Sequence, residues 1–256
     1  MSLLLALACG PSTPQEARSV AQLKELDLSG VEELALVDRG FGPELATALV
    51  EGAPGLIRLD LSGNLLGTTG GAALAGLASL EVLDLGPGRV YVEGNRIGTK
   101  GARALLSAPD GALVDLDLSR NGVEGEAFRA LTHPLQTLVV DSNSIGDEGC
   151  ASIAGISTLK KLHMGWAGVG DACAVALGAH QGLEELLLSS NDIGDAGVEA
   201  LAKMPSLRVL YLSNNAVTDG APLRHLERLN LDGNPLADRE ALKRDFEGDW
   251  LSAEPL

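Results

Sequence analysis

The sequence has few aromatic residues, few basic residues and no long apolar run. Two Trp, two Tyr and three Phe stand among 256 residues, so the interior of the protein has to be aliphatic. Lys and Arg number 19 against 35 Asp and Glu, a net charge of −16. Because phosphate backbones bind to basic patches, this balance argues against nucleic acid as a partner. No stretch approaches the ~18–20 apolar residues of a membrane-spanning helix, so no span is expected.

What the sequence does contain is an internal repeat, seen best from Leu183 to Ala202. This stretch reads L-x-x-L-x-L-x-x-N-x-I-G-D-x-G and continues as a short helical pattern. Copies begin at Leu23, Val31, Leu56, Leu80, Leu113, Leu135, Leu159, Leu183, Leu207 and Leu226, and the full-length copies are about 22 to 26 residues apart. The L-x-L core alternates with period two, which predicts a short strand with one buried face. Stacked copies bury what one strand and one helix cannot, so the repeat predicts a solenoid with a continuous parallel sheet.

Polar residues mark the end of each strand and the start of each helix. An asparagine column follows the strands, where an amide can both donate to and accept from turning backbone: Asn64, Asn95, Asn121, Asn143, Asn191, Asn215 and Asn234. Arg39 and Ala167 interrupt this column. The residues interpreted as N-caps of their own helices are Thr68, Thr99, Asp147, Asp171 and Asp195.

These residues resemble the leucine-rich-repeat family, in its ribonuclease-inhibitor-like branch, over roughly Leu23 to Leu236. The resemblance implies an α/β solenoid, a curved horseshoe with a parallel sheet inside and short helices outside. It says little about function, because this fold serves many unrelated binding tasks. The repeats are shorter than those of ribonuclease inhibitor and Cys is scarce, so ribonuclease inhibition is not carried over. The arginine and asparagine of GTPase-activating relatives find no clear counterpart. The composition also favours a bacterial source.

The outward positions of the sheet are the family's usual contact surface. In the N-terminal half they are Glu25, Asp27, Glu33, Asp60, Asp84, Asp115, Asp117 and Asp141, with Arg58 as the exception. In the C-terminal half they are Lys161, His163, Leu187, Val209, Tyr211, Ser213, Arg228 and Asn230. The surface is therefore expected to change from an acidic stripe to an apolar and aromatic patch. The acidic stripe either steers a basic partner or reflects the frequency of Asp after Leu at this position. Tandem Asp motifs are missing, so calcium is not expected.

Four residues of three successive copies, His163, Trp166, Leu187 and Tyr211, are expected to meet on the C-terminal half of this surface. Exposed aromatics are common anchors of protein interfaces, so these residues are the predicted partner contacts, with Asp115, Asp117 and Asp141 beside them. The alternative for Trp166 is inward packing into the space left by the missing asparagine at Ala167.

An insertion delays the asparagine of the copy that begins at Leu80. Residues 86–94 intervene before Asn95 and include Tyr91. Insertions in solenoids fall in loops on one face, often the binding face, so Tyr91 is a further candidate contact. The alternative is a tolerated loop without a function.

Both ends of the chain depart from the repeat. Met1 to Cys9 resembles the end of a bacterial lipoprotein signal, with Cys9 as the lipidation candidate, but its apolar run is short and no Lys or Arg precedes it. The alternative is an apolar capping turn. The protein is exported or envelope-bound in the first case and cytoplasmic in the second. Three segments are predicted: 1–22 as a leader or cap with a linker, 23–237 as the repeats, and 238–256 as a C-terminal capping helix with Trp250 in its seal.

The remaining chemistry points away from catalysis. No G-x-S-x-G, P-loop or H-E-x-x-H is present, and of the four His only His163 is expected on the sheet surface. Cys150 and Cys173 fall in adjacent helices, and because such helices lie about 8–10 Å apart, two buried thiols are expected and not a disulfide. The prediction is a monomeric, non-catalytic protein-binding module without cofactor or metal. The alternatives are an envelope lipoprotein with a structural role, or a hydrolase or GTPase regulator that uses His163 or Arg89.

Overall fold

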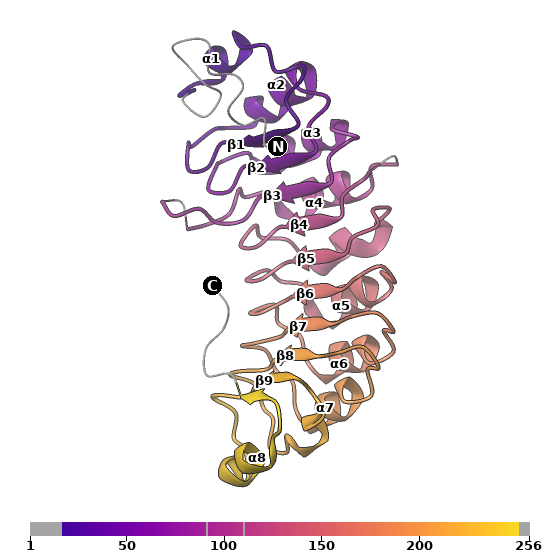
Figure 1. The fold of residues 1–256 in the computed structure, drawn as a ribbon. Helices are drawn as coiled ribbons and strands as arrows, with labels where there is room; N and C mark the ends of the chain where they lie inside the picture. The colour runs from indigo at the N-terminus through magenta and orange to yellow at the C-terminus, as the bar shows by residue number, and fades with distance from the viewer. Residues whose placement is uncertain (1–16, 91, 110, 251–256) are drawn as a thin grey trace. The chain divides into compact units, whose positions relative to one another are not determined.

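A computed structural model describes residues 17–90, 92–109 and 111–250 and divides into two compact units, Met1–Leu135 and Gln136–Leu256. Within each unit, parallel strands of three residues form one layer and short helices form the other (Figure 1). Leucines of the L-x-L cores, such as Leu186 and Leu188, are fully buried between the layers. The predicted α/β repeat fold with a parallel sheet is confirmed.

In the described part of the first unit, four parallel strands follow one another in sequence order. They are β1 (Glu33–Ala35), β2 (Arg58–Asp60), β3 (Val82–Asp84) and β4 (Asp115–Asp117). The helices are α1 (Val20–Lys24), α2 (Glu44–Gly52), α3 (Gly67–Ala73) and α4 (Gly98–Leu106), with 3₁₀ helices η3 (Leu74–Gly76) and η4 (Gly125–Ala130). The copy that begins at Leu23 forms α1 and a turn, so of the two closely spaced first copies it is the one that lacks a strand.

Residues 136–250 of the second unit contain six parallel strands, again in sequence order. They are β5 (Thr137–Val139), β6 (Lys161–His163), β7 (Glu185–Leu187), β8 (Val209–Tyr211), β9 (Arg228–Asn230) and β10 (Asp249–Trp250). The helices are α5 (Gly146–Ala154), α6 (Asp171–Leu177), α7 (Asp195–Leu201) and α8 (Arg239–Asp245), with the 3₁₀ helix η5 (Ala221–Leu223). Strand β10 is an addition that the repeat pattern does not predict.

The asparagine column hydrogen-bonds to turning backbone, as predicted, and its bonds also form a ladder between repeats, which was not predicted. In Asn191, Nδ2 donates to the carbonyl of Met164 in the preceding repeat at 2.8 Å and to that of Leu188 in its own at 3.0 Å. Its Oδ1 accepts from the N–H of Val169 at 3.2 Å. Bonds to the preceding repeat are also made by Asn64, Asn95, Asn121, Asn215 and Asn234. Each of these side chains therefore ties two neighbouring repeats together.

Four of the five predicted N-caps, Thr99, Asp147, Asp171 and Asp195, accept hydrogen bonds from the start of the next repeat's helix and not from their own. Asp171 is the first residue of α6, but its Oδ1 accepts from the N–H groups of Gly194 at 2.8 Å and Gly197 at 2.9 Å, at the start of α7. Asp147, Asp195 and Thr99 also reach into the following repeat. No side-chain cap bond is made at the residues that precede the helices α3, α4, α5, α6 and α7. Parallel stacking brings the next helix start within reach, so the caps become links between repeats.

Two buried histidines brace the turns that lead into strands. His180 accepts at Nδ1 from the N–H groups of Gly182 at 3.1 Å and Leu183 at 3.0 Å. Its Nε2 lies 2.9 Å from the carbonyl oxygen of Ile156, which accepts the ring N–H when the proton is on Nε2. His133 accepts at Nδ1 from the N–H of Leu113 at 3.2 Å, and its Nε2 lies 2.9 Å from the carbonyl oxygen of Leu105. Both histidines therefore have structural partners on each ring nitrogen.

Cys150 and Cys173 form a disulfide, so the expectation of two separate thiols is wrong. Their Cα atoms are 5.4 Å apart, well inside the expected helix spacing. The reason lies in a glycine column that Cys173 interrupts. A Cβ atom placed on Gly197, the equivalent residue one repeat later, would lie 2.9 Å from the Cβ of Ala174, the counterpart of Cys150. Neighbouring helices come closest at this column, and a cysteine there faces its partner directly.

The C-terminal helix expected after Leu236 is present as α8. The Asp238 side chain accepts from the N–H of Ala241 at 2.8 Å, which fixes the helix start. Leu242 is buried on the last repeat. Trp250 lies in β10, where its ring packs edge-to-face on Phe246 with a centroid distance of 6.1 Å. None of the described helices is long and apolar enough to cross a bilayer.

Candidate interaction surface

Strand register arranges the outward side chains of each unit in two rows. In the first unit the rows are Glu33–Arg58–Val82–Asp115 and Ala35–Asp60–Asp84–Asp117. In the second unit they are Thr137–Lys161–Glu185–Val209–Arg228 and Val139–His163–Leu187–Tyr211–Asn230. The predicted change from an acidic row to a row with apolar and aromatic residues is therefore present in the register.

Three predicted members of the acidic stripe lie elsewhere. Glu25 and Asp27 follow helix α1 and precede β1, and the Asp27 carboxylate accepts from the N–H of Ser29 in a local turn. This hydrogen bond and that from the Ser29 hydroxyl lower the pKa of Asp27. Asp141 lies two residues past β5, and its Oδ1 accepts from the N–H of Gly165. These placements were missed because the strands are only three residues long.

The acidic row of the first unit has a local structural role. Each carboxylate accepts from the backbone N–H two residues later: Asp60 from Ser62 at 2.9 Å, Asp84 from Gly86 at 2.8 Å and Asp117 from Ser119 at 2.7 Å. A carboxylate at this position closes the turn that ends the strand. This observation favours the interpretation that Asp is selected here by the fold.

Asp84 is the member of that row whose charged form is destabilised. Burial, together with the neighbouring carboxylates of Asp117 and Asp60, raises the pKa of Asp84 from 3.8 to about 7, against the hydrogen bond from Gly86 that lowers it. Asp84 is therefore close to half-protonated at neutral pH.

Within the described ranges, no three His, Cys, Asp or Glu side chains are grouped so as to hold a metal ion.

Trp166 is the prominent exposed side chain of the second unit. It is 70% exposed, so the predicted alternative of inward packing is wrong. The missing asparagine leaves no space that needs an indole, because Ala167 itself is fully buried and its N–H donates to Asn191 Oδ1 at 3.1 Å. The N–H of Trp166 donates to the carbonyl of Ser189 at 3.0 Å, which fixes the turn beneath the ring.

Trp166 occupies a left-handed backbone position. Its φ is +53°, and in other repeats the residue before the asparagine column also has positive φ: Asp38, Gly63, Arg120, Ser142, Ser190, Asn214 and Gly233. Most of these are small or polar residues of the types that tolerate this conformation. A bulky aromatic at this position carries a conformational cost, and most of its surface stays exposed.

The other three members of the predicted patch contribute less surface. Leu187 is 7% exposed and Tyr211 is 2% exposed, so the expectation that both are open contact residues is wrong. His163 is partly buried, and its Nε2 lies 3.2 Å from Glu185 Oε1. Lys161 pairs with the same carboxylate at 3.4 Å. Only Trp166 thus presents a large open apolar face among these four positions.

The backbone of the insertion after β3 is hydrogen-bonded to the side chain of Asp38. The Asp38 carboxylate accepts from the N–H groups of Arg89 at 2.8 Å and Val90 at 3.2 Å. Val90 is 72% exposed and Val92 is 58% exposed, so this loop presents aliphatic surface. Tyr91, the candidate contact, lies outside the described residues. Sequence reasoning named only the aromatic residue, although the V-x-V pattern around it was the available signal for exposed valines.

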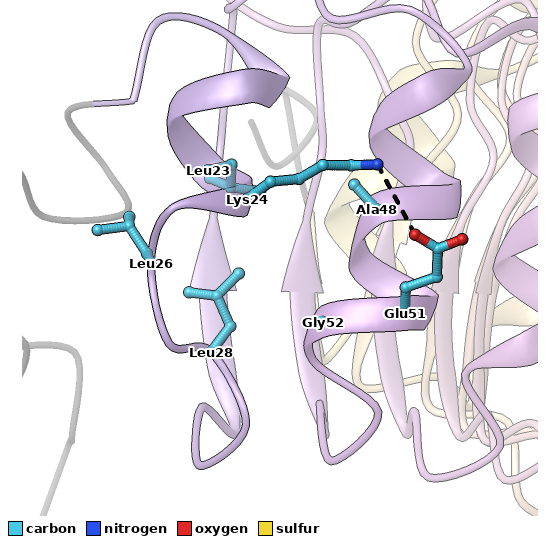
Figure 2. Close-up of a pocket in the computed structure, with 7 residues that line it drawn as sticks. All are labelled: Leu23, Lys24, Leu26, Leu28, Ala48, Glu51 and Gly52. Atoms are coloured by element: carbon cyan, nitrogen blue, oxygen red, sulfur yellow. Dashed lines mark ion pairs between the residues drawn. The ribbon is translucent and has the colours of Figure 1, made fainter.

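Figure 2 shows a cavity of about 260 Å³ between α1 and α2. It is lined by Leu23, Lys24, Leu26, Leu28, Ala48, Glu51 and Gly52. Lys24 and Glu51 pair across it at 3.7 Å, and both side chains are more than half exposed. The remaining lining is aliphatic or backbone. Cys9, the lipidation candidate, lies outside the described residues.

Comparisons with known proteins agree with this geometry. Two family models described as leucine-rich repeat match the chain, one over residues 181–236 and the other over residues 56–75 and 133–154. Among solved structures, internalin C2 from Listeria monocytogenes has a TM-score of 0.60 and 24% sequence identity, covering 88% of this chain and 85% of that chain. This likeness concerns the fold alone. A comparison with curated proteins finds no match.

Proposed function

We propose that this chain, parts of which match leucine-rich-repeat family models, is a non-catalytic module that binds a protein partner through the surface around Trp166. The observation that carries the proposal is an indole that is 70% exposed at a left-handed backbone position. A non-glycine residue in that conformation costs about 1–2 kcal/mol. Neither the conformation nor the exposure stabilises the fold, and Trp is among the residues most enriched at the centres of protein interfaces.

The neighbouring side chains support a rigid contact. The Glu185 carboxylate lies 3.4 Å from Lys161 Nζ and 3.2 Å from His163 Nε2. These contacts restrict the Lys161 and His163 side chains on β6, the strand that leads into the Trp166 turn. The contact surface proposed is therefore Trp166 with His163 at its side. Tyr91 and its valine neighbours form a separate candidate contact in the first unit.

The charge of the chain supports a partner with a basic surface. The net charge is −16, and Asp115 and Asp117 stand on β4 in the two outward rows of the first unit. A field of this sign raises the association rate of a basic protein and is screened by salt. The association rate constant is expected to fall when salt is raised from 0.05 to about 0.5 M, with a smaller effect on dissociation.

Finer assignments belong to the same proposal. Regular α-helices in α2, α4 and α5 support the ribonuclease-inhibitor-like branch, and a bacterial source and a monomeric state are proposed with it. A lipid anchor at Cys9 is proposed only for the case in which the protein is exported. Metabolic labelling with a fatty acid, comparing the wild type with Cys9→Ser, separates an anchored protein from a cytoplasmic one.

The test is capture of partners by Trp166→Ser against the wild type. Ser stands at the equivalent position in both adjacent repeats, Ser142 and Ser190, so the variant should fold with an unchanged or higher melting temperature. The matched control is Val175→Ser, which removes another exposed apolar side chain, 57% exposed, from helix α6. A protein captured by the wild type and the control and lost from Trp166→Ser supports the proposal. Identical captured proteins at equal stability refute it.

A further inference from the structure

One boundary in the second unit lacks the asparagine link, the boundary between repeats 135–158 and 159–182. The link between one repeat and the one before it is supplied by Asn191, Asn215 and Asn234 at the later boundaries of this unit. Position 167 holds alanine in their place.

The missing bonds can be specified by analogy. The N–H of Ile193 donates to Asn215 Oδ1 and that of Val217 donates to Asn234 Oδ1, each at 3.0 Å. Ile145 is the equivalent donor in the repeat before Ala167, and the methyl group of Ala167 offers no acceptor. The same substitution removes the amide donor that would reach the carbonyl of Val140.

The disulfide joins the same two repeats. Cys150 lies in α5 and Cys173 in α6, on the helix layer, and both are fully buried. Cys173 replaces the column glycine that stands at Gly149 and Gly197. The repeat that loses its asparagine on the strand side thus gains a covalent bond on the helix side.

We infer that the Cys150–Cys173 disulfide takes the place of the missing asparagine link and holds the Trp166 turn in its binding conformation. This inference rests on the proposed function for its link to binding. A dithiol breaks the bond by a two-electron reduction: the S–S bond is lost, two S–H bonds form, and the dithiol becomes a disulfide. The oxidised chain is the binding form, so the protein acts in an oxidising compartment.

The decisive test is a rescue experiment on stability. Cys150→Ala/Cys173→Ala is expected to lower the melting temperature by roughly 5–10 °C. Adding Ala167→Asn to that variant restores roughly 2–5 °C, whereas Ala167→Asn alone in the oxidised wild type gains less than half as much. Equal gains in both backgrounds overturn the inference, because they show that the two links are independent.

Hydrogen exchange locates the effect without any partner. Several backbone bonds cross this boundary, and two of them lie where the chain leaves the strand: the N–H of Ser142 donates to the carbonyl of Gly165 at 2.8 Å, and that of Gly146 donates to the carbonyl of Ala167 at 3.1 Å. In Cys150→Ala/Cys173→Ala, which lacks the disulfide, these amides should exchange at least about tenfold faster than in the wild type. The control is the amide of Ser190, which donates to the carbonyl of Ser213 in the following repeat, and its exchange rate should be unchanged. Uniform acceleration, or none, overturns the inference.

Partner binding is measured in a separate capture experiment. If the oxidised chain captures a partner and the reduced chain loses it, the link to the Trp166 surface stands. If both forms capture it equally, that link is refuted. If neither form captures a partner, the proposed function fails while the rescue and exchange results still decide the role of the disulfide.

Discussion

Replacing Asp84 with Asn should stabilise the protein at neutral and alkaline pH and have little effect near pH 4. Burial and the neighbouring carboxylates raise the folded-state pKa of Asp84 to about 7. A carboxyl group whose pKa is raised on folding favours the folded state while it is protonated. Its contribution is full below the unfolded value of 3.8 and is lost as the pH rises toward 7, because the unfolded chain releases the proton first.

The size of the expected stabilisation follows from the pKa shift of Asp84. Three pKa units correspond to about 4 kcal/mol at 1.36 kcal/mol per unit, which is an upper bound. Solvent reaches this half-buried side chain and screens its charge, so we expect about 2 kcal/mol above pH 7. The amide oxygen of Asn keeps the bond from the N–H of Gly86 and removes the repulsion from Asp60 and Asp117. The variant should therefore lose the pH dependence that this one group contributes.

The assay is urea unfolding of Asp84→Asn and the wild type at several pH values between 4 and 8.5, followed by circular dichroism. The difference between the two midpoints should grow through this range and level off above pH 7. Asp115→Asn, on the neighbouring strand in the other row, is the matched control and should show no such growth. A difference that is constant with pH, or that shrinks as the pH rises, would show that Asp84 is not destabilised by its charge.

Two further substitutions test the links within the second unit. His180→Ala should cost about 1–3 kcal/mol, since it leaves a buried carbonyl and two buried N–H groups without their partner, and His225→Ala, at an exposed position, should cost less than about 0.5 kcal/mol in thermal melts. Equal costs would mean that the buried ring only fills space. Asp171→Ala should cost about 1 kcal/mol by removing the cap of the following helix, with Asp192→Ala as the control, and faster amide exchange should appear in α7 and not in α6. Exchange confined to α6 would contradict capping across the repeats.

The repeat, the strands and the asparagine column were predictable because they depend on short-range patterns. Alternation of period two places Leu186 and Leu188 inward whatever the neighbouring repeat contains. An asparagine where the chain leaves a strand has few other uses than hydrogen bonding to buried backbone, and Asn191 does so in the structure. These features repeat many times, so one misread copy does not affect the conclusion.

Contacts between repeats were harder to predict, because they depend on distances that the pattern does not contain. Asp171 at a helix start has the appearance of a cap for α6, and only the stacking geometry shows that it reaches α7. General helix spacing argued against a bond between Cys150 and Cys173. The glycines around Cys173 marked a close approach of the helices, and this was the signal that could have corrected the estimate.

Exposure on the sheet surface was the least predictable property. Side chains in register share a face, and His163, Leu187 and Tyr211 do lie in one row. Register does not determine how much of each side chain is open, and Tyr211 is 2% exposed. Trp166, three residues past His163 and outside the strand, was assigned to this patch only by sequence proximity, yet it is the open member.

Three departures from the repeat fall in one copy, and their coincidence supports a common cause. Residues 159–182 contain a tryptophan at the left-handed position, an alanine in the asparagine column and a cysteine in the glycine column. The first two substitutions are adjacent, Trp166 and Ala167, and each removes a residue that the fold favours. The third, Cys173, adds a covalent bond to the preceding repeat. Independent drift would scatter such changes over the copies. An exposed aromatic contact that needs a modified turn, with a compensating link on the opposite layer, accounts for all three together.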